Sequence, residues 1–471
     1  MPPNKLISTI IWAIYLTGWI YAGDGSGTAE GKFPRGTLID TVACLDNPEQ
    51  TYSLYLPESS VADPPILVFL EPGARGKLPV GKYMGLAERY GFILASSNNG
   101  RNGPAELYRD ALDAMIPDLV NRFSPDTTRL VLSGFSGGAR YASIYSSIRM
   151  KAGVIACGAG ISPHGGAEQL QLPFYTGIVG RMDMNFIDVI SSVQKAQQEG
   201  TPAWMIVWGG GHFWPDSLSF ARALDQVLVY WHTRGLVCMP DPEITRISYD
   251  MSVQFDSMLT ENRYYEAKMM EANLKVHPLF DPGSARWQEI ISRIPSGQMQ
   301  KKSDREWQKI RQREMAYIDT ILSALDGFIM AIYNQPGKLR PDSWWKMRGK
   351  QVNRVMDSDD AILSESGYRM YDYTWRSCWS WGVSHLEDPA GAEQAARYFR
   401  AWCSFEPTSP QAFYLLSASY AIAGQGKKAI KALETAVENG FSRPDLVERS
   451  EAFDSLRSEE KFMDLVGKMK D

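Results

Sequence analysis

The 471-residue chain has only five cysteines and contains no Cys-x-x-C pair. Zinc ribbons and thioredoxin-type redox sites need such pairs, so the sequence supports neither. Free thiols are the expected state of these widely spaced cysteines, although a disulfide between Cys44 and Cys238 is geometrically conceivable. An excess of basic residues is missing as well: 49 Lys and Arg stand against 54 Asp and Glu, for a net charge of −5. A nucleic-acid-binding protein normally has a basic face, so we expect no nucleic-acid partner.

Long apolar runs are missing except near the start of the sequence. Residues 6–22 carry no charge, follow Lys5 and lead into a stretch of small and polar residues. A basic start, an apolar centre and an exit of small residues are typical of a secretory signal. We therefore expect residues 1–23 to direct export, with cleavage near Ala22 or Gly23 and a secreted or periplasmic product. An uncleaved membrane anchor is the alternative, because the run reaches the lower limit of length for a bilayer-spanning helix.

From residue 24 to residue 239, short apolar runs alternate with helix-like segments. Gly or Pro bounds most of the runs, and the intervening segments place apolar residues at helical spacing. Continuous apolar strands separated by amphipathic helices are typical of a parallel sheet that helices cover on both faces. The pattern predicts a doubly wound, mostly parallel α/β domain over residues 24–239.

The pattern changes at residue 240, where strand-like runs stop and long helical stretches begin. We expect residues 240–375 to form a helical region of uncertain type. Within 376–471, the sequence resembles tetratricopeptide repeats over 376–441, followed by a terminal cap. The unit with the better spacing has its turn at Gly424 and its pattern residues at Phe413, Leu416, Tyr420, Ala429, Leu433 and Ala436. This resemblance implies a protein partner that binds through the helical repeats.

A serine stands among glycines at residues 134–138, which read Gly-Phe-Ser-Gly-Gly and match the pattern G-x-S-x-G. A strand-like run precedes the motif and an amphipathic helix-like segment follows it. A tight bend from strand to helix forces the central residue into an unfavourable backbone conformation, and small neighbours leave room for its hydroxyl. The motif predicts Ser136 as a nucleophile. A glycine-rich turn without chemistry is the competing interpretation.

A serine hydroxyl becomes a good nucleophile only when a base takes its proton, so a histidine is needed. His212 directly follows an apolar run and three glycines, where a strand would leave the sheet at the same edge as Ser136. His164 also follows a strand-like run and is the rival base. The other histidines are expected in packing or surface roles, and they are His232, His277 and His385.

The histidine in turn needs a carboxylate that fixes its tautomer and stabilises its positive charge. Asp183 follows the strand-like run before the last one and is the predicted acid. Asp188, which lies inside the next helix-like segment, is the reserve candidate. Asp216 follows His212 too closely for the usual chain order and is expected to cap the next helix.

Hydrolysis of an acyl group also requires N–H donors where negative charge develops on the former carbonyl oxygen. Gly137 comes directly after the nucleophile, so its backbone N–H is the first predicted donor. The second donor is expected in the loop after the run ILVFL, at Gly73, Ala74 or Arg75.

Residues 36–239 resemble the α/β-hydrolase fold, and within it the exported esterases that include polyhydroxyalkanoate depolymerases and feruloyl esterases. The resemblance is carried by SGFSGGARYA around Ser136 and GGGHFWP around His212. It implies hydrolysis of carboxylic esters by Ser136, His212 and Asp183 without a metal or an organic cofactor. The loop LEPGARG lacks the His-Gly pair common in that group, and the helical extension is not standard for it.

No long insertion separates the apolar runs on either side of residues 160–172, so we expect no large lid. An open site suits a bulky or polymeric ester. The same residues could also hydrolyse an amide, which would make the protein a serine peptidase. A repeat-based binding scaffold with a vestigial hydrolase domain is the competing function of a different class.

Overall fold

The computed structural model divides the chain into two compact units, Ala29–Arg311 and Gln312–Asp471. The structure describes residues 33–59, 63–161, 171–275, 288–289, 292, 297–332, 339–386 and 389–470. The predicted export segment, residues 1–23, lies outside these described residues. Among the helices described, none is both long and apolar enough to cross a bilayer.

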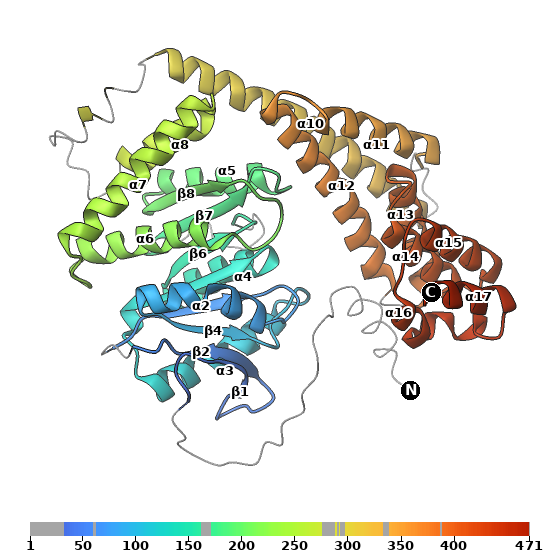
Figure 1. Cartoon of the computed structure of the whole chain (residues 1–471), viewed down its shortest axis with the longest axis horizontal. Helices are drawn as coiled ribbons and strands as arrows, with labels where there is room; N and C mark the ends of the chain where they lie inside the picture. The colour runs from blue at the N-terminus through green and yellow to red at the C-terminus, as the bar shows by residue number, and fades with distance from the viewer. Residues whose placement is uncertain are drawn as a thin grey trace. The chain divides into compact units, whose positions relative to one another are not determined.

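The first unit contains an eight-stranded sheet with the strand order β1-β2-β4-β3-β5-β6-β7-β8 (Figure 1). Strands β3 to β8 run parallel to one another, whereas β2 is antiparallel to both of its neighbours, β1 and β4. The strands are β1 (Leu38–Ala43), β2 (Thr51–Tyr55), β3 (Ile66–Leu70), β4 (Ile93–Ser97), β5 (Leu130–Phe135), β6 (Gly153–Cys157), β7 (Tyr175–Gly180) and β8 (Ala203–Trp208). This mixed, mostly parallel sheet has the α/β-hydrolase fold that the sequence predicted.

Helices cover both faces of this sheet because its central strands are apolar on both sides. In β3, Ile66 and Val68 belong to one buried cluster, whereas Leu67 and Phe69 belong to the other. Successive side chains of a strand point to opposite faces, so each face of the sheet has its own apolar core. The covering helices are α2 (Lys77–Tyr90), α3 (Glu106–Phe123), α4 (Gly137–Tyr145), α5 (Phe186–Gln198) and α6 (Ser217–Thr233).

The first unit does not end at residue 239, where the sequence placed a boundary, but reaches Arg311. Helices α7 (Asp241–Thr260) and α8 (Tyr264–Lys275) and the start of α10 (Gln298–Ile332) belong to it. Asn273 on α8 donates a hydrogen bond to the backbone oxygen of Met205 in β8, at 3.0 Å. Arg181, directly after β7, forms an ion pair with Glu266 on α8. The boundary of the compact unit is therefore set by packing on the sheet rather than by the last strand.

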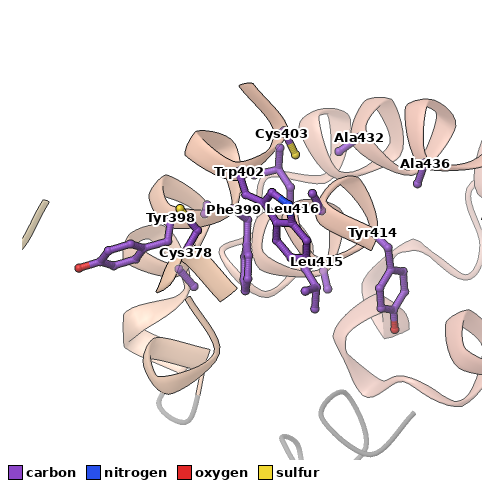
Figure 2. Close-up of a cluster of buried hydrophobic side chains, with 14 of the residues drawn as sticks. Cys378, Tyr398, Phe399, Trp402, Cys403, Tyr414, Leu415, Leu416, Ala432 and Ala436 are labelled. Carbon is purple, nitrogen blue, oxygen red and sulfur yellow. The ribbon is translucent and has the colours of Figure 1, made fainter. Parts of the chain in front are cut away.

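The second unit is helical throughout its described residues. Its helices after α10 are α11 (Asp342–Met356), α12 (Ala361–Leu386), α13 (Ala392–Phe405), α14 (Pro410–Ile422), α15 (Gly426–Glu438), α16 (Pro444–Arg449) and α17 (Glu460–Lys468). Figure 2 shows part of its core, where Phe399 and Trp402 of α13 lie near Leu415 and Leu416 of α14. These side chains are buried, and the shared core explains why the helices form one compact unit.

The helix pair predicted around Gly424 is present as α14 and α15. Gly424 lies in the turn between them with φ of +70°, a conformation that glycine adopts without a steric penalty. Ala429, Leu433 and Ala436 of α15 are buried, as the repeat spacing requires. The tetratricopeptide character of these helices stays a prediction, because a helix pair with small buried residues is not specific to that repeat.

The five cysteines all lie within the described residues, and all five are free. Cys44 is buried and Cys238 is exposed, and the two form no disulfide with each other. Free thiols, the expected state, are therefore what the structure contains.

Candidate active site

Ser136 occupies the single position between β5, which ends at Phe135, and α4, which begins at Gly137. Its φ of +53° lies in a region that a residue with a side chain enters at a cost of about 1–3 kcal/mol. The backbone N–H of Ser136 donates to the oxygen of Cys157 at 2.9 Å and holds the bend against the neighbouring strand β6. A strained residue held in this way is typical of a displayed nucleophile.

The glycines around Ser136 are required by close approach of the backbone. A Cβ atom on Gly138 would lie 2.1 Å from the backbone oxygen of Leu70, at the end of β3. A Cβ atom on Gly134 would lie 2.3 Å from the backbone of Gly138 itself. Both distances are far inside van der Waals contact, so the sharp bend can form only with glycine at these two positions.

His212 lies in the loop between β8 and α6, and its ring contacts Ser136 and Asp183. The His212 Nε2 atom is 3.0 Å from the Oγ of Ser136. On the other side of the ring, Nδ1 is 2.9 Å from the Oδ1 of Asp183. A carboxylate can only accept a hydrogen bond, so Nδ1 carries the proton and the Nε2 lone pair faces the serine hydroxyl.

Asp183 lies in the short connection between β7 and α5 and is almost completely buried, with 1% of its surface exposed. Its Oδ1 accepts a second hydrogen bond from the backbone N–H of Asn185 at 2.8 Å. Two donors on one oxygen orient the carboxylate toward the imidazole. The structure therefore brings together Ser136, His212 and Asp183, the three residues that the sequence singled out.

Aromatic side chains fix the position of the His212 ring. The ring of Phe135, the residue before Ser136, lies 4.7 Å from the imidazole between centroids, and Trp214 packs on Phe135 at 5.6 Å. The hydroxyl of Tyr83 donates to the backbone oxygen of Pro215 at 2.9 Å and anchors the same loop. Trp214 and Pro215 therefore act as structural supports of the histidine loop.

The other residues considered from the sequence lie away from this contact or outside the described residues. Asp188 accepts from Arg140 at 2.7 Å and from the N–H of Gly160 at 3.0 Å, so its carboxylate has other partners. Asp216 caps α6, as predicted, by accepting from the backbone N–H of Ser219 at 2.7 Å. His164 and His277 are not among the described residues.

The two remaining histidines lie elsewhere in the described chain. His232 is on α6, and its Nδ1 accepts a hydrogen bond from the backbone N–H of Met239 at 3.2 Å. His385 stacks on Tyr398 in the second unit, and burial lowers the pKa of its imidazole. Both therefore have the packing or surface roles expected from the sequence.

The predicted oxyanion donors divide into one available N–H group and several occupied ones. Gly137 is the first residue of α4, and its N–H has no hydrogen-bond partner within the described residues. Gly73 donates instead to the Oε2 of Glu71 at 2.7 Å, and Ala74 donates to the backbone oxygen of Glu71 at 3.2 Å. The N–H of Arg75 also donates to Glu71 Oε2, at 3.1 Å. The expected second donors are thus already engaged.

Glu71 is a residue of this region that the sequence interpretation missed. Its side chain is fully buried, accepts the N–H groups of Gly73 and Arg75, and also pairs with the guanidinium of Arg75. Burying a charged carboxylate is very costly unless it is paired with an opposite charge and hydrogen-bonded, and Glu71 satisfies both conditions. The available signal was a carboxylate placed directly at the end of the continuous apolar strand β3.

An exposed aromatic side chain borders the site. Phe213, the residue after His212, has 55% of its surface exposed and makes an edge-to-face contact with Trp208 at 5.2 Å. An exposed phenylalanine beside a reactive group offers apolar surface to a substrate. Within the described residues, no group of three or more His, Cys, Asp or Glu side chains could hold a metal ion.

Comparisons with known proteins find similarity to solved structures only. No family model matches the chain, and no curated protein does either. The monoclinic form of the Pyrobaculum calidifontis esterase is 14% identical over 43% of this chain and 87% of its own, with a TM-score of 0.35. A ferulic acid esterase is 19% identical over 42% of this chain and 98% of its own, with a TM-score of 0.32.

An α/β serine hydrolase homologue from Coxiella burnetii is 17% identical over 41% of this chain and 97% of its own, with a TM-score of 0.34. At such identities and TM-scores, only the geometry of the site itself bears on the chemistry of this chain.

Proposed function

We propose that this protein is a serine hydrolase that cleaves carboxylic esters through an acyl-enzyme. Ser136 is the nucleophile, His212 the base, and Asp183 the carboxylate that orients and stabilises His212. The observation that carries the proposal is the continuous contact from Ser136 Oγ to His212 Nε2 and from His212 Nδ1 to Asp183 Oδ1. The strained backbone of Ser136 supports it, because a strain of this kind is retained where it serves a reaction.

In the first half of the proposed reaction, the Oγ of Ser136 attacks the ester carbonyl carbon while His212 Nε2 takes the hydroxyl proton. Asp183 stabilises the imidazolium that forms. The tetrahedral intermediate carries its negative charge on the former carbonyl oxygen, near the N–H of Gly137. The imidazolium then gives its proton to the leaving alcohol, and the acyl group stays on Ser136.

In the second half, a water molecule takes the place of the alcohol. His212 removes a proton from the water as it attacks the acyl carbon, and the collapse of the second intermediate returns the proton to Ser136. The acid product leaves with the enzyme in its starting state. No step in this sequence needs a redox change or a cofactor, because His212 carries each proton from its donor to its acceptor and is restored at the end of the cycle.

The test of this function is covalent labelling of the full chain with a fluorophosphonate, which reacts with activated serines. We expect labelling at Ser136 that disappears in Ser136→Ala. Ser143→Ala is the matched control, because Ser143 lies on α4 in the same unit and only donates to the backbone of its own helix. A wild-type chain that resists the probe, or labelling that survives in Ser136→Ala, would contradict the proposal and favour a scaffold with a vestigial hydrolase domain.

Esters are proposed over amides because the sequence around Ser136 and His212 resembles that of exported esterases. The exposed Phe213 beside the site suits an acyl or aryl group of the substrate. Parallel measurements of kcat/KM on p-nitrophenyl butyrate and on a peptide p-nitroanilide separate the two classes. A preference for the anilide would replace the esterase by a serine peptidase on the same residues.

We also propose that the protein is exported, on the strength of the sequence of residues 1–23. The matching experiment is N-terminal sequencing of the chain recovered from the medium or periplasm of a producing cell. A mature chain that begins near residue 23 supports export with cleavage, and an intact chain in the membrane fraction supports the anchor instead.

A further inference from the structure

A tetrahedral oxyanion is normally stabilised by two or more donors, and the structure leaves the second one to be assigned. Gly137 supplies one backbone N–H. The N–H groups of Gly73, Ala74 and Arg75 are turned toward Glu71. For any of them to serve, the fully buried Glu71 would have to give up a hydrogen bond, which is costly.

A side chain from another loop lies at the same place. Asn102 belongs to the connection between β4 and α3, and its backbone N–H donates to the oxygen of Pro72 at 2.9 Å. A Cβ atom built on Gly137 would fall 1.9 Å from the Asn102 Oδ1 and 3.1 Å from its Nδ2. The carboxamide of Asn102 therefore fills the space that a side chain of residue 137 would occupy, directly beside the first predicted donor.

Tyr108 sets the orientation of this carboxamide. Its hydroxyl donates to the Asn102 Oδ1 at 3.2 Å, and its ring is buried and stacked on Tyr141 at 5.1 Å. Burial, and then the charge of Glu71, raise the pKa of Tyr108, so the hydroxyl keeps its proton and remains a donor. With Oδ1 accepting from Tyr108, the amide Nδ2 is left as the free end, and no described residue accepts from it.

We propose that the side-chain amide of Asn102 is the second donor of the oxyanion site, acting beside the N–H of Gly137. The inference rests on the proposed serine hydrolase function. The same arrangement assigns roles to two neighbours. Glu71 keeps the loop after β3 folded away from the oxyanion, and Tyr108 is a positioning residue that holds the Asn102 amide in its working orientation. The second donor thus comes from the loop after β4 rather than from the loop after β3.

The test compares Asn102→Ala and the isosteric Asn102→Asp with wild type in the full chain. Kinetics on p-nitrophenyl butyrate give kcat and KM, and a trifluoromethyl ketone, which forms a charged tetrahedral adduct with a serine, gives Ki. We expect kcat to fall about 10²-fold in both variants while KM stays within about threefold. Ki should rise by the same factor as kcat falls, because both report the stabilisation of an oxyanion.

Asn99→Ala is the control for a loss of loop structure. Asn99 lies in the same loop, where it accepts from the backbone N–H of Thr51 at 2.8 Å and donates to the backbone oxygen of Glu49 at 3.0 Å. Its removal should lower the thermal midpoint but leave kcat within about threefold of wild type.

If Asn99→Ala lowers kcat as much as Asn102→Ala does, or if both Asn102 variants keep wild-type kcat and Ki, the inference is overturned while the hydrolase function stands. A wild-type chain inert to both substrate and fluorophosphonate overturns both.

Discussion

The Oγ of Ser136 lies 3.0 Å from the Nε2 of His212, although the two residues are 76 positions apart in the chain. Each residue follows the carboxyl end of a parallel strand, β5 for the serine and β8 for the histidine. Parallel strands bring their carboxyl ends to one edge of the sheet, which is why loops distant in sequence meet there. The contact is thus a consequence of sheet topology.

Replacing Ser136 by glycine should abolish activity and stabilise the fold. The φ of +53° costs nothing for glycine, so Ser136→Gly should raise the free energy of unfolding by about 1 kcal/mol. The expected loss in kcat/KM is about 10⁴- to 10⁶-fold. Urea unfolding followed by tryptophan fluorescence measures the first effect. A variant less stable than wild type would show that the turn is not strained.

The glycines of the turn should be intolerant of a methyl group. Gly138→Ala places a Cβ 2.1 Å from the backbone oxygen of Leu70, so the turn must shift and the serine with it. We expect a loss of at least about 1 kcal/mol in stability and a clear fall in kcat.

Gly85→Ala is the matched control for that substitution, since Gly85 is inside helix α2 and a Cβ there meets no atom within 4 Å. This change should leave kcat intact and be neutral or stabilising by up to about 1 kcal/mol. Equal effects of the two alanines would contradict the steric argument.

Glu306 should make the first unit less stable as the pH rises. Burial raises the pKa of Glu306 to about 7, from an ordinary value of 4.5, although its carboxylate accepts from the backbone N–H of Tyr265 at 2.8 Å. The folded state therefore holds the proton more tightly than the unfolded state, so the stability contributed by protonated Glu306 is lost as the pH rises from about 4.5 through 7.

Thermal midpoints of wild type and Glu306→Gln at several pH values test this effect. The thermal midpoint of the variant should rise relative to that of wild type between pH 5 and pH 8, because glutamine cannot ionise. A difference between the two proteins that is constant across this range would mean that Glu306 does not titrate there.

The second unit should depend on a buried ion pair. Arg369 on α12 and Glu314 on α10 are nearly inaccessible to solvent and form three hydrogen bonds with each other. Glu314→Ala leaves a buried guanidinium without its carboxylate, and the expected cost is about 3–5 kcal/mol. The double variant Glu314→Leu with Arg369→Met should recover much of that loss. Asp445→Ala, which removes the partner of the more exposed Arg443, should cost less than about 1 kcal/mol.

Much of the fold and site could be predicted from local pattern. Continuous apolar runs bounded by Gly and Pro predict buried parallel strands, because only a strand covered on both faces needs no polar side. The run before Ser136 and the glycines around it predict the turn, since a Cβ at Gly134 or Gly138 would collide with the backbone. His212 and Asp183 could be predicted because each comes shortly after a strand in the chain order of this fold.

Other features depend on contacts that no local pattern reports. The compact unit extends past residue 239 because α8 packs on β8, and the strand pattern had already ended there. The loop after β3 was expected to supply a donor from Gly73 or Ala74, but a buried Glu71 takes both N–H groups. Such a pairing is decided by which polar atoms must be satisfied once water is excluded.

The sequence by itself determined the alternation of strands and helices and the tight turn at Ser136, because periodicity and backbone sterics are local properties of the chain. It favoured His212 and Asp183 as the partners of Ser136 through their order in the chain, with His164 and Asp188 as alternatives. Only the tertiary structure decided that Asn102 lies against Gly137 and that Glu71 closes the neighbouring loop. The first contact joins loops that follow different strands, β4 and β5. The second is between near neighbours in the chain, but a charged side chain accepts these bonds only because the folded sheet buries it.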